Sequence, residues 1–375
     1  MSDDRYIHWL ALALTPNLGA RTMGKLLRQY GSPQAVFGAS LTELEAARLT
    51  APVAQAIHSR ESLRAAEKEL AQARQLGITL LHWDEPAYPQ RLLEIYDPPP
   101  LLYVRGNVEL LSHHMMGMVG TRRPTPYGNQ MAERIARDLA ERGLVIASGL
   151  ARGIDSSSHK GALASARGTT VAVLGTGVDV IYPKENRKLF AQIAERGAIL
   201  SEFPIGTQPF PQNFPIRNRI VAGMSLGVVV VEGAQYSGSL ISARLAMEFN
   251  REVYGVPGNV TQPPSFAPNQ LIKQGAKLVM GWEDVVEELP TEIRAELFPV
   301  ETPAAEQRAS LFEQSLSDHE KALFSLLSVD QSRPIDELVE LSGLNSSQVL
   351  ATLFELEMKG LIRQMPGKNF VKVLL

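Results

Sequence analysis

Four stretches of one region decide the fold: Met115-Met-Gly-Met-Val-Gly-Thr-Arg-Arg-Pro-Thr-Pro-Tyr-Gly128, Ala147-Ser-Gly-Leu-Ala-Arg-Gly-Ile-Asp155, Thr169-Thr-Val-Ala-Val-Leu-Gly-Thr-Gly-Val178 and Gly227-Val-Val-Val-Val-Glu-Gly-Ala-Gln-Tyr-Ser-Gly-Ser239. In each stretch a short apolar run ends in a glycine-containing turn, and a helical pattern follows. Such runs, alternating with helices, predict a parallel sheet buried on both faces. We therefore expect an α/β fold with a doubly wound, mostly parallel sheet.

The same alternation gives the expected elements of this region. Strands are expected near residues 115–119, 144–148, 169–174, 198–201, 227–231 and 252–256, and helices near 127–142, 156–166, 186–196, 216–225 and 239–250. In open parallel sheets, ligands bind where the strands end and the helices begin. The backbone N–H groups and the helix dipole at such an edge favour anions.

The charge distribution also indicates an anionic ligand. The whole chain has 37 Lys and Arg against 40 Asp and Glu, which gives a net charge of -3. Residues 115–280 alone hold 18 basic and 11 acidic residues, so this region carries +7 and the remainder -10. A basic centre within an acidic chain favours a polyanionic partner. Many of the bases stand in the expected turns, where ordinary solvated surface charge is the alternative interpretation.

The flanking sequence predicts smaller domains on either side. Residues 1–76 read as all-helical, and two helices joined at Asn17-Leu-Gly-Ala20 resemble a helix-hairpin-helix or SAM-like unit. The α/β core is expected over 77–289, and the Pro- and Glu-rich residues 290–310 have the composition of a linker. Contact with nucleic acid through the N-terminal hairpin and a purely structural or protein-contact role are both left open.

Residues 311–375 predict a third domain. The capping box Ser317-Asp-His-Glu320 begins the first of three expected helices, and a β-hairpin closes the chain. Three helices followed by a hairpin resemble a winged helix. The third helix carries Glu355, Glu357 and Lys359, whereas a DNA-reading helix should be basic on its open face. We therefore expect this domain to make a protein contact or a weak accessory contact.

Composition and motifs exclude several chemistries. The 375 residues include no cysteine, so thiolate catalysis, disulfides and Cys-ligated zinc are excluded. Gly175-Thr-Gly177 lacks the third glycine of a dinucleotide fingerprint, and no Walker motif appears. Ser237 and Ser239 have no visible acid–base partner, and His159 reads as a structural hydrogen-bonding residue. We expect no catalytic residue, no metal and no cofactor.

The N-terminal apolar run does not indicate membrane insertion. It extends only from Trp9 to Leu14, which is too short for a membrane span and lacks a signal-peptide cleavage pattern. The expectation is therefore a cytoplasmic protein with no membrane span.

Five motifs carry a resemblance to a known family. They are Gly120-Thr-Arg-Arg-Pro-x-x-Tyr-Gly, Ser148-Gly-Leu-Ala-Arg-Gly-Ile-Asp-x-x-x-His, Tyr182-Pro-Lys-Glu-Asn, Phe214-Pro-x-Arg-Asn-Arg-Ile-Val-Ala-Gly and Val256-Pro-Gly-Asn. In this order they resemble the DNA-processing protein A family (DprA/Smf), over roughly residues 80–290. Members of that family often carry an N-terminal SAM-like domain and a C-terminal winged helix, which agrees with both flanks.

The resemblance implies an extended Rossmann fold and a protein that binds single-stranded DNA without being an enzyme. Such proteins form homodimers, protect incoming DNA during natural transformation in competent bacteria, and load the RecA recombinase in DNA recombination. The family pairs through the late end of its sheet, which corresponds here to Phe266–Leu278.

Motif by motif, the resemblance implies phosphate contacts by Arg122, Lys184, Arg217 and Arg219. It also implies that the backbone N–H groups of Gly120, Ser148, Gly149 and Gly153 lie close to the DNA strand. Phe214 is a candidate to stack on a base, with core packing as its alternative role. The complete expected site consists of Gly120, Arg122, Arg123, Ser148, Gly149, Arg152, Gly153, Lys184, Asn186, Phe214, Arg217, Asn218 and Arg219.

Two other functions are weighed against DNA binding. Related Rossmann-type hydrolases cleave nucleoside monophosphates through a Pro-Gly-Gly-x-Gly-Thr turn and a glutamate. The corresponding turn, Val231–Ser239, lacks the Gly-Gly pair and the downstream carboxylate. A protein-only scaffold is the other alternative, and salt-sensitive DNA binding by the basic centre would distinguish it.

Overall fold

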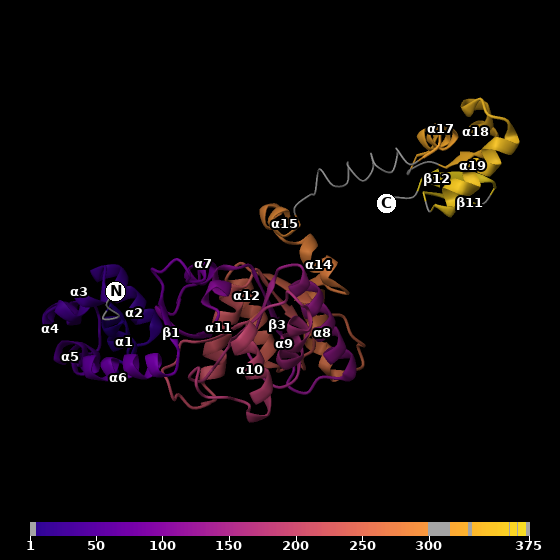
Figure 1. Cartoon of the computed structure of the whole chain (residues 1–375). Helices are drawn as coiled ribbons and strands as arrows, with labels where there is room; N and C mark the ends of the chain where they lie inside the picture. Colours follow the sequence, from indigo (N-terminus) through magenta and orange to yellow (C-terminus); the bar gives the residue numbers. More distant parts are fainter. Residues whose placement is uncertain (1–4, 299–315, 329–331, 360, 366, 373–375) are drawn as a thin grey trace. The chain divides into compact units, whose positions relative to one another are not determined.

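The computed structural model describes residues 5–298, 316–328, 332–359, 361–365 and 367–372. It forms two compact units, Met1–Phe298 and Pro299–Leu375, whose elements are labelled in Figure 1. The first unit is built around a nine-stranded sheet with the order β1-β2-β6-β5-β4-β3-β7-β8-β9. Its strands are β1 (Thr79–His82), β2 (Leu101–Gly106), β3 (Met115–Val119), β4 (Val145–Ser148), β5 (Thr170–Val173), β6 (Ala198–Ser201), β7 (Gly227–Val230), β8 (Glu252–Gly255) and β9 (Lys277–Leu278).

The sheet is parallel from β6 to β9, and β1 and β2 extend it in antiparallel register. The strand order reverses between β3 and β7, because β3 pairs with β4 on one side and with β7 on the other. This reversal is the topological switch point at which open α/β sheets bind ligands. The predicted mostly parallel α/β sheet is therefore confirmed.

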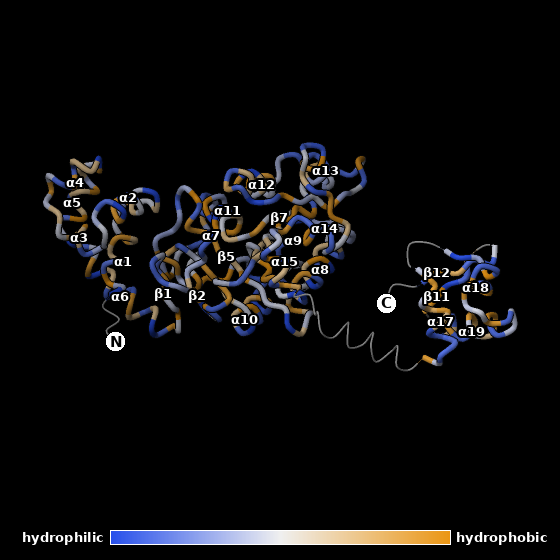
Figure 2. Tube along the Cα trace, turned by 90° about the horizontal axis from the view of Figure 1, so that it is seen from above, coloured by the Kyte–Doolittle hydropathy of each residue, from blue (hydrophilic) through white to orange (hydrophobic). Residues whose placement is uncertain are grey.

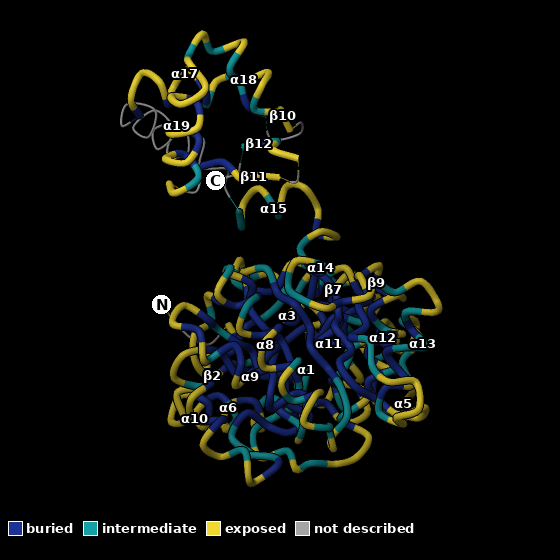
Figure 3. Tube along the Cα trace, turned by 90° about the vertical axis from the view of Figure 1, so that its right-hand side faces the viewer, coloured by how far each residue is buried: buried dark blue, intermediate teal, exposed yellow. Residues whose placement is uncertain are grey.

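Helices cover both faces of the sheet. On one face, Met116 and Met118 of β3 share a buried cluster with α8 (Pro126–Glu141) and α9 (Ile154–Ala164). On the other, β7 packs with α11 (Asn213–Met224) and α12 (Gly238–Glu248). In Figure 3 the strands form the buried, dark blue interior of this unit, and in Figure 2 the chain alternates between hydrophobic and hydrophilic residues along the helices. The burial of both faces explains the continuous apolar runs in the sequence.

Short elements complete the core. Those before β3 are α7 (Gln90–Leu93) and the 3₁₀ turn η1 (Val108–Ser112). Those after it are η2 (Lys184–Asn186), α10 (Arg187–Arg196), η3 (Pro263–Ser265), α13 (Phe266–Lys273), α14 (Trp282–Glu287) and α15 (Thr291–Leu297). The α15 helix lies within the expected linker, and residues 299–310 of that expectation fall outside the described part of the chain. Among the described residues, no helix combines the length and apolar character of a membrane span.

The N-terminal region is helical, as expected, and shares a core with the sheet. It consists of α1 (Arg5–Ala13), α2 (Ala20–Tyr30), α3 (Pro33–Gly38), α4 (Leu41–Ala46), α5 (Ala51–Ser59) and α6 (Glu61–Gln75). The Trp9 ring stacks on His82 of β1 at 4.5 Å between ring centroids. The Glu69 carboxylate accepts a hydrogen bond from the Ile205 N–H at 2.8 Å. Residues 1–76 therefore belong to the same compact unit as the α/β core.

The second unit has its own apolar core and the elements of a winged helix. It contains α17 (Asp318–Leu326), β10 (Arg333–Pro334), α18 (Ile335–Ser342), α19 (Ser346–Met358), β11 (Ile362–Met365) and β12 (Asn369–Lys372). The predicted capping box begins α17, since the Ser317 hydroxyl accepts from the Glu320 N–H and the Glu320 carboxylate accepts from the Ser317 N–H. The wing pairs Gln364 with Phe370 in antiparallel register.

Candidate functional site

A groove of about 620 Å³ lies at the switch point, where β3, β4 and β7 end. The loop after β3 contributes Gly120, Arg122 and Arg123 to its lining. Other lining residues come from the loop after β4, from α11, and from the start of α12; they include Ala151, Asp155, Phe214, Arg217, Asn218, Ser237 and Ser242. With Tyr182 from the loop after β5, the groove gathers five segments that are far apart in sequence, at the edge where the sequence places a ligand site.

An arginine and two rings form one wall of the groove. The exposed Arg122 guanidinium lies over the half-buried Phe214 ring, 5.6 Å from its centroid. Tyr182 packs against the same ring at 5.5 Å with the planes tilted by 35°. A cation above an aromatic face is held by the ring quadrupole without losing its charge. Within the described residues, Arg122 forms no ion pair with a carboxylate, and the buried Asp155 feels its charge from beyond ion-pair distance.

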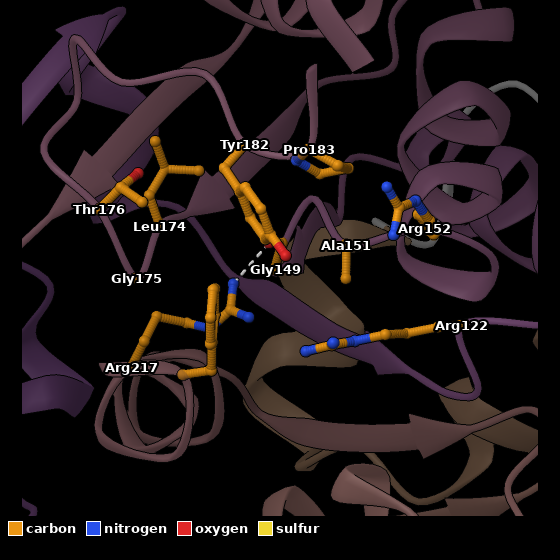
Figure 4. Close-up of a pocket in the computed structure, with 11 residues that line it drawn as sticks. Arg122, Gly149, Ala151, Arg152, Leu174, Gly175, Thr176, Tyr182, Pro183 and Arg217 are labelled. Atoms are coloured by element: carbon orange, nitrogen blue, oxygen red, sulfur yellow. Dashed lines mark hydrogen bonds between the residues drawn. The ribbon is translucent and has the colours of Figure 1, made fainter. Parts of the chain in front are cut away.

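Arg217 lies deeper, below the Tyr182 ring. Its Nη1 donates to the Gly149 carbonyl oxygen at 2.6 Å and to the carbonyl oxygen of Val173, the last residue of β5. Figure 4 shows Arg122 and Arg217 directed toward the same space beneath Tyr182. A Cβ at Gly149 would collide with this guanidinium and displace it from its carbonyl acceptors, so the glycine permits the Arg217 contacts. Arg217 is therefore a buried cation that ties the ends of two strands together.

Asp155 balances the charge of Arg217 within the site. The carboxylate is buried and accepts hydrogen bonds from the N–H groups of Gly149, at 3.2 Å, and Ala151, at 3.3 Å. Burial raises the pKa of Asp155, while the charge of Arg217 and the two N–H groups oppose that rise. Burial likewise lowers the pKa of Arg217, against the attraction of Asp155. Arg122 adds a smaller opposing effect on the pKa of Asp155, so the carboxylate orders the loop after β4 and interacts mainly with the buried Arg217.

The loop that carries Arg122 is held by its backbone and by Glu232. The Thr121 N–H donates to the Glu232 carbonyl oxygen at 2.7 Å, and the Thr121 carbonyl oxygen accepts from the Ile154 N–H at 3.2 Å. The Glu232 carboxylate accepts from the Thr125 N–H and hydroxyl at 2.9 and 2.5 Å. Gly153, with φ of +76°, lets the next loop approach the Thr121 carbonyl where a side chain would clash. The Arg122 loop is therefore fixed before any ligand binds.

The structure corrects the expectation that Arg219 faces a phosphate. Its side chain is only 6% exposed, and its Nε lies 3.3 Å from Asp97 while its Nη2 is hydrogen-bonded to Glu202. Burial raises the pKa of Glu202 and of Asp97, and the charge of Arg219 opposes both rises. Arg219 is thus a buried ion-pair residue behind the groove, and it does not line the groove itself.

Three other expected site residues have internal partners. The Ser148 hydroxyl is buried and donates to the Met118 carbonyl oxygen at 2.6 Å. The Asn186 amide donates to the Leu150 carbonyl oxygen and to the Ser156 hydroxyl, both at 2.9 Å. The exposed Arg152 forms an ion pair with Glu185. These residues therefore order the loops around the groove.

Lys184 and Asn218 remain available on the surface near the groove. Lys184 is exposed and directly follows Tyr182 and Pro183, which line a small cavity beside the groove. Asn218 is half-buried and lines the groove itself, as do Gly120 and Arg123. Within the described residues, no group of three or more His, Cys, Asp or Glu side chains could hold a metal ion.

Sequence reasoning missed two functional features of this wall. Tyr182 was part of a motif but was assigned no role, although its ring contacts Phe214. Glu232 is absent from the expected site, yet its carboxylate holds the Arg122 loop through Thr125. A signal for Glu232 was present, because a carboxylate directly after a buried Val run needs a hydrogen-bonding partner.

Sequence comparisons identify relatives of the chain. Residues 79–290 match the family described as DNA recombination-mediator protein A, and residues 303–368 match the DprA winged helix domain. The DNA processing protein DprA of Bacillus subtilis is 42% identical over 256 residues, which cover 64% of this chain and 86% of that protein. Protein Smf of Escherichia coli is 38% identical over 304 residues, covering 80% and 79% respectively.

Two solved structures resemble the chain. DNA processing protein A from Streptococcus pneumoniae aligns with a TM-score of 0.68 at 34% identity, covering 76% of this chain and 98% of that one. The Helicobacter pylori protein, described with a unique single-stranded DNA binding mode, aligns with a TM-score of 0.51 at 32% identity and covers 56% and 94%.

Replacing Arg219 by Ala should destabilise the fold, because Asp97 and Glu202 would be left without their cation. We expect a loss of about 3–5 kcal/mol at about pH 8 in urea denaturation. Both carboxyl pKa values are already raised by burial and would rise further without Arg219. Stability gained on protonation is present at low pH and lost as pH rises, so the deficit should shrink at about pH 5. The exposed Arg123→Ala should stay within about 0.5 kcal/mol of the parent, and an equal effect of both changes would contradict this account.

Proposed function

The chain belongs to the DNA recombination-mediator protein A family, and we propose on this premise that it binds single-stranded DNA in the groove at the switch point. The observation that carries the proposal is the exposed Arg122 guanidinium above the Phe214 ring, on a loop that is already ordered. It offers a phosphate contact and a stacking surface side by side, which is the combination that binding to single strands without sequence preference requires.

The electrostatics of the groove support an anionic strand. Asp155 faces Arg217 and two backbone donors, and Glu232 is engaged by Thr125, so both carboxylates are neutralised or hydrogen-bonded locally. Arg122 and Arg123 are exposed and form no ion pair with a carboxylate among the described residues. Phosphates of the strand would therefore meet guanidinium groups that are free to pair with them. Because a duplex hides the faces of its bases, the half-buried Phe214 ring favours a single strand as the ligand.

Residues of the expected site divide into two roles in this proposal. Arg122, Arg123, Lys184, Asn218 and Phe214 contact the strand, together with the backbone of Gly120. The others position that surface: Ser148, Gly149, Gly153, Asn186, Arg217 and Arg219 from beneath it, and Arg152 through its exposed ion pair with Glu185. No nucleophile or metal is needed for this task, and we propose a binding protein without a catalytic step. Release of free base from a nucleoside monophosphate would instead favour the Rossmann-type hydrolase.

Replacing Arg122 by Ala should weaken binding of every single-stranded sequence alike. If Arg122 neutralises one phosphate, the logarithmic salt slope should fall by about 0.7. The melting temperature should stay unchanged, because the side chain is exposed and has no carboxylate partner within the described residues. Affinity measured by fluorescence anisotropy at several salt concentrations, with unlabelled duplex as competitor, tests both statements.

Arg123→Ala is the matched control, since it removes the same charge from the neighbouring position. Arg123 has no ring contact in the described structure, and Pro124 keeps the chain extended beside it. We expect a smaller loss than for Arg122→Ala. An unchanged salt slope in Arg122→Ala would remove Arg122 from the site, and equal competition by duplex would contradict a single-strand site.

We also propose that the chain forms a homodimer through the β9 end of its sheet. β9 is the last strand in the order, and Leu278 and Met280 are 38% and 63% exposed there. Exposed apolar residues on an unpaired edge favour association. Light scattering should detect a dimer at high micromolar concentration, and Leu278→Glu should shift it toward monomer. A strict monomer in the parent protein would contradict the proposal.

The cellular role that we propose is protection of incoming DNA in natural transformation and loading of RecA, which rests on family membership alone. Loading predicts that the protein speeds RecA filament formation on a strand already coated with single-strand-binding protein. An unchanged rate with a protein that still binds the strand would contradict the loading role. This role places the protein in the cytoplasm, which recovery in another cell fraction would contradict.

A further inference from the structure

Tyr236 is a large aromatic side chain that the fold leaves almost entirely in solvent. It follows β7, in the loop before α12, and is 92% exposed. An aromatic side chain stabilises a fold by being buried, so the folded chain gains little from this exposed one. A side chain of this kind at the rim of a binding groove points to contact with a ligand.

The backbone around Tyr236 is fixed. The Ser237 N–H donates to the Ala234 carbonyl oxygen at 3.0 Å, which closes a tight turn with Tyr236 inside it. At the base of this turn, the Gly233 N–H donates to the Pro264 carbonyl oxygen at 2.6 Å, and the Gly233 carbonyl oxygen accepts from the Ala267 N–H at 2.8 Å. A tyrosine has only two side-chain torsions, so a ring on such a turn can be ordered by a ligand at low entropic cost.

A cavity of about 410 Å³ lies beside the ring, lined by Thr121, Ala234, Gln235, Tyr236, Ser237, Pro263 and Phe266. Thr121 and Ser237 also line the basic groove, so the two spaces adjoin. Thr121 directly precedes Arg122 in the sequence. A chain molecule whose phosphate lies on Arg122 could therefore continue into this cavity.

The lining indicates which part of a strand would enter. None of the lining side chains carries a charge, and Tyr236, Pro263 and Phe266 present flat apolar faces. Phosphates are therefore favoured in the basic groove and a base in the cavity. At the edge of the cavity, the Thr121 hydroxyl accepts from the Arg123 N–H at 3.2 Å and can still donate, while the Gln235 amide offers both a donor and an acceptor.

We propose that the cavity between Tyr236 and Phe266 is a second base-binding subsite, in which Tyr236 stacks on a nucleobase of the strand held by Arg122. This inference rests on the proposed function of the groove. It extends the path of the strand from Phe214, across Thr121, to the loop between β7 and α12. Stacking on aromatic side chains tolerates every base, so the subsite adds affinity without adding sequence preference.

The test compares Tyr236→Ala and Tyr236→Phe in the full chain, using labelled oligothymidylates of about four and about twelve nucleotides. We expect Tyr236→Ala to weaken binding of the longer strand by about fivefold to a hundredfold, with the salt slope unchanged because no charge is removed. The short strand should be affected less, because Arg122 and Phe214 can hold it alone. Tyr236→Phe keeps the stacking face and should bind within about twofold of the parent.

Abasic strands identify the contact. One abasic nucleotide is placed at each position of the longer strand in turn. At one position it should weaken binding by the parent protein but not by Tyr236→Ala, because both changes remove the same stacking contact. Tyr96→Ala is the control, since Tyr96 is 56% exposed, packs against Phe249 and lines neither space. It should leave binding of both strands unchanged.

Three outcomes would overturn the subsite. They are unchanged affinity of Tyr236→Ala for the longer strand, an equal loss at every abasic position, and a loss of binding that accompanies a loss of dimer in light scattering. A failure of the proposed function, DNA binding in the groove, gives a different result. The parent protein would then show no salt-dependent binding, or Arg122→Ala would keep the salt slope of the parent.

Discussion

The site depends on one buried cation, the guanidinium of Arg217. A charge buried in this way is costly unless it is paired and hydrogen-bonded. Here it donates to the carbonyl oxygens of Gly149 and Val173 and faces Asp155, so its desolvation is offset at the ends of two strands. Asp155 in turn holds two N–H groups of the loop after β4. Removing Arg217 would leave the buried Asp155 carboxylate without its main counter-charge, and the carbonyl oxygens of Gly149 and Val173 without this donor.

The same cation constrains its surroundings. His159 is fully buried, with Nδ1 2.7 Å from the Thr170 hydroxyl, which confirms its expected structural role. Burial, and then the charge of Arg217, lowers the pKa of His159 to about 3, so the ring stays neutral beneath the site. Internal charges are thus satisfied by internal partners. The charges that remain for a ligand are those of Arg122 and Arg123 on the ordered loop above, and of the exposed Lys184 nearby.

The sheet could be predicted from the sequence because the signal for each strand, a short apolar run followed by a turn, lies within a few consecutive residues. Each strand from β3 to β7 is a buried apolar run, because helices cover both faces of the sheet there. Arg217 and Arg219 show where such reasoning ends. They belong to one motif, and both read as surface charges, yet α11 is packed on several sides and buries both. Their partners are distant in the sequence or lie in another loop: Gly149 for Arg217, and Asp97 and Glu202 for Arg219. Only the tertiary structure decides which arginine of a motif faces the ligand.

The two compact units also differ in the kind of surface that each presents to a partner. A winged helix that reads bases needs donors or cations on the open face of its third helix. On α19 that face instead presents Leu350, Phe354 and Met358, which are 55%, 64% and 74% exposed and one helical turn apart. Apolar side chains at this spacing suit contact with protein, as the acidic charges of the helix already indicated. The groove, with positive charge beside aromatic rings, has the chemistry that a strand of phosphates and bases requires.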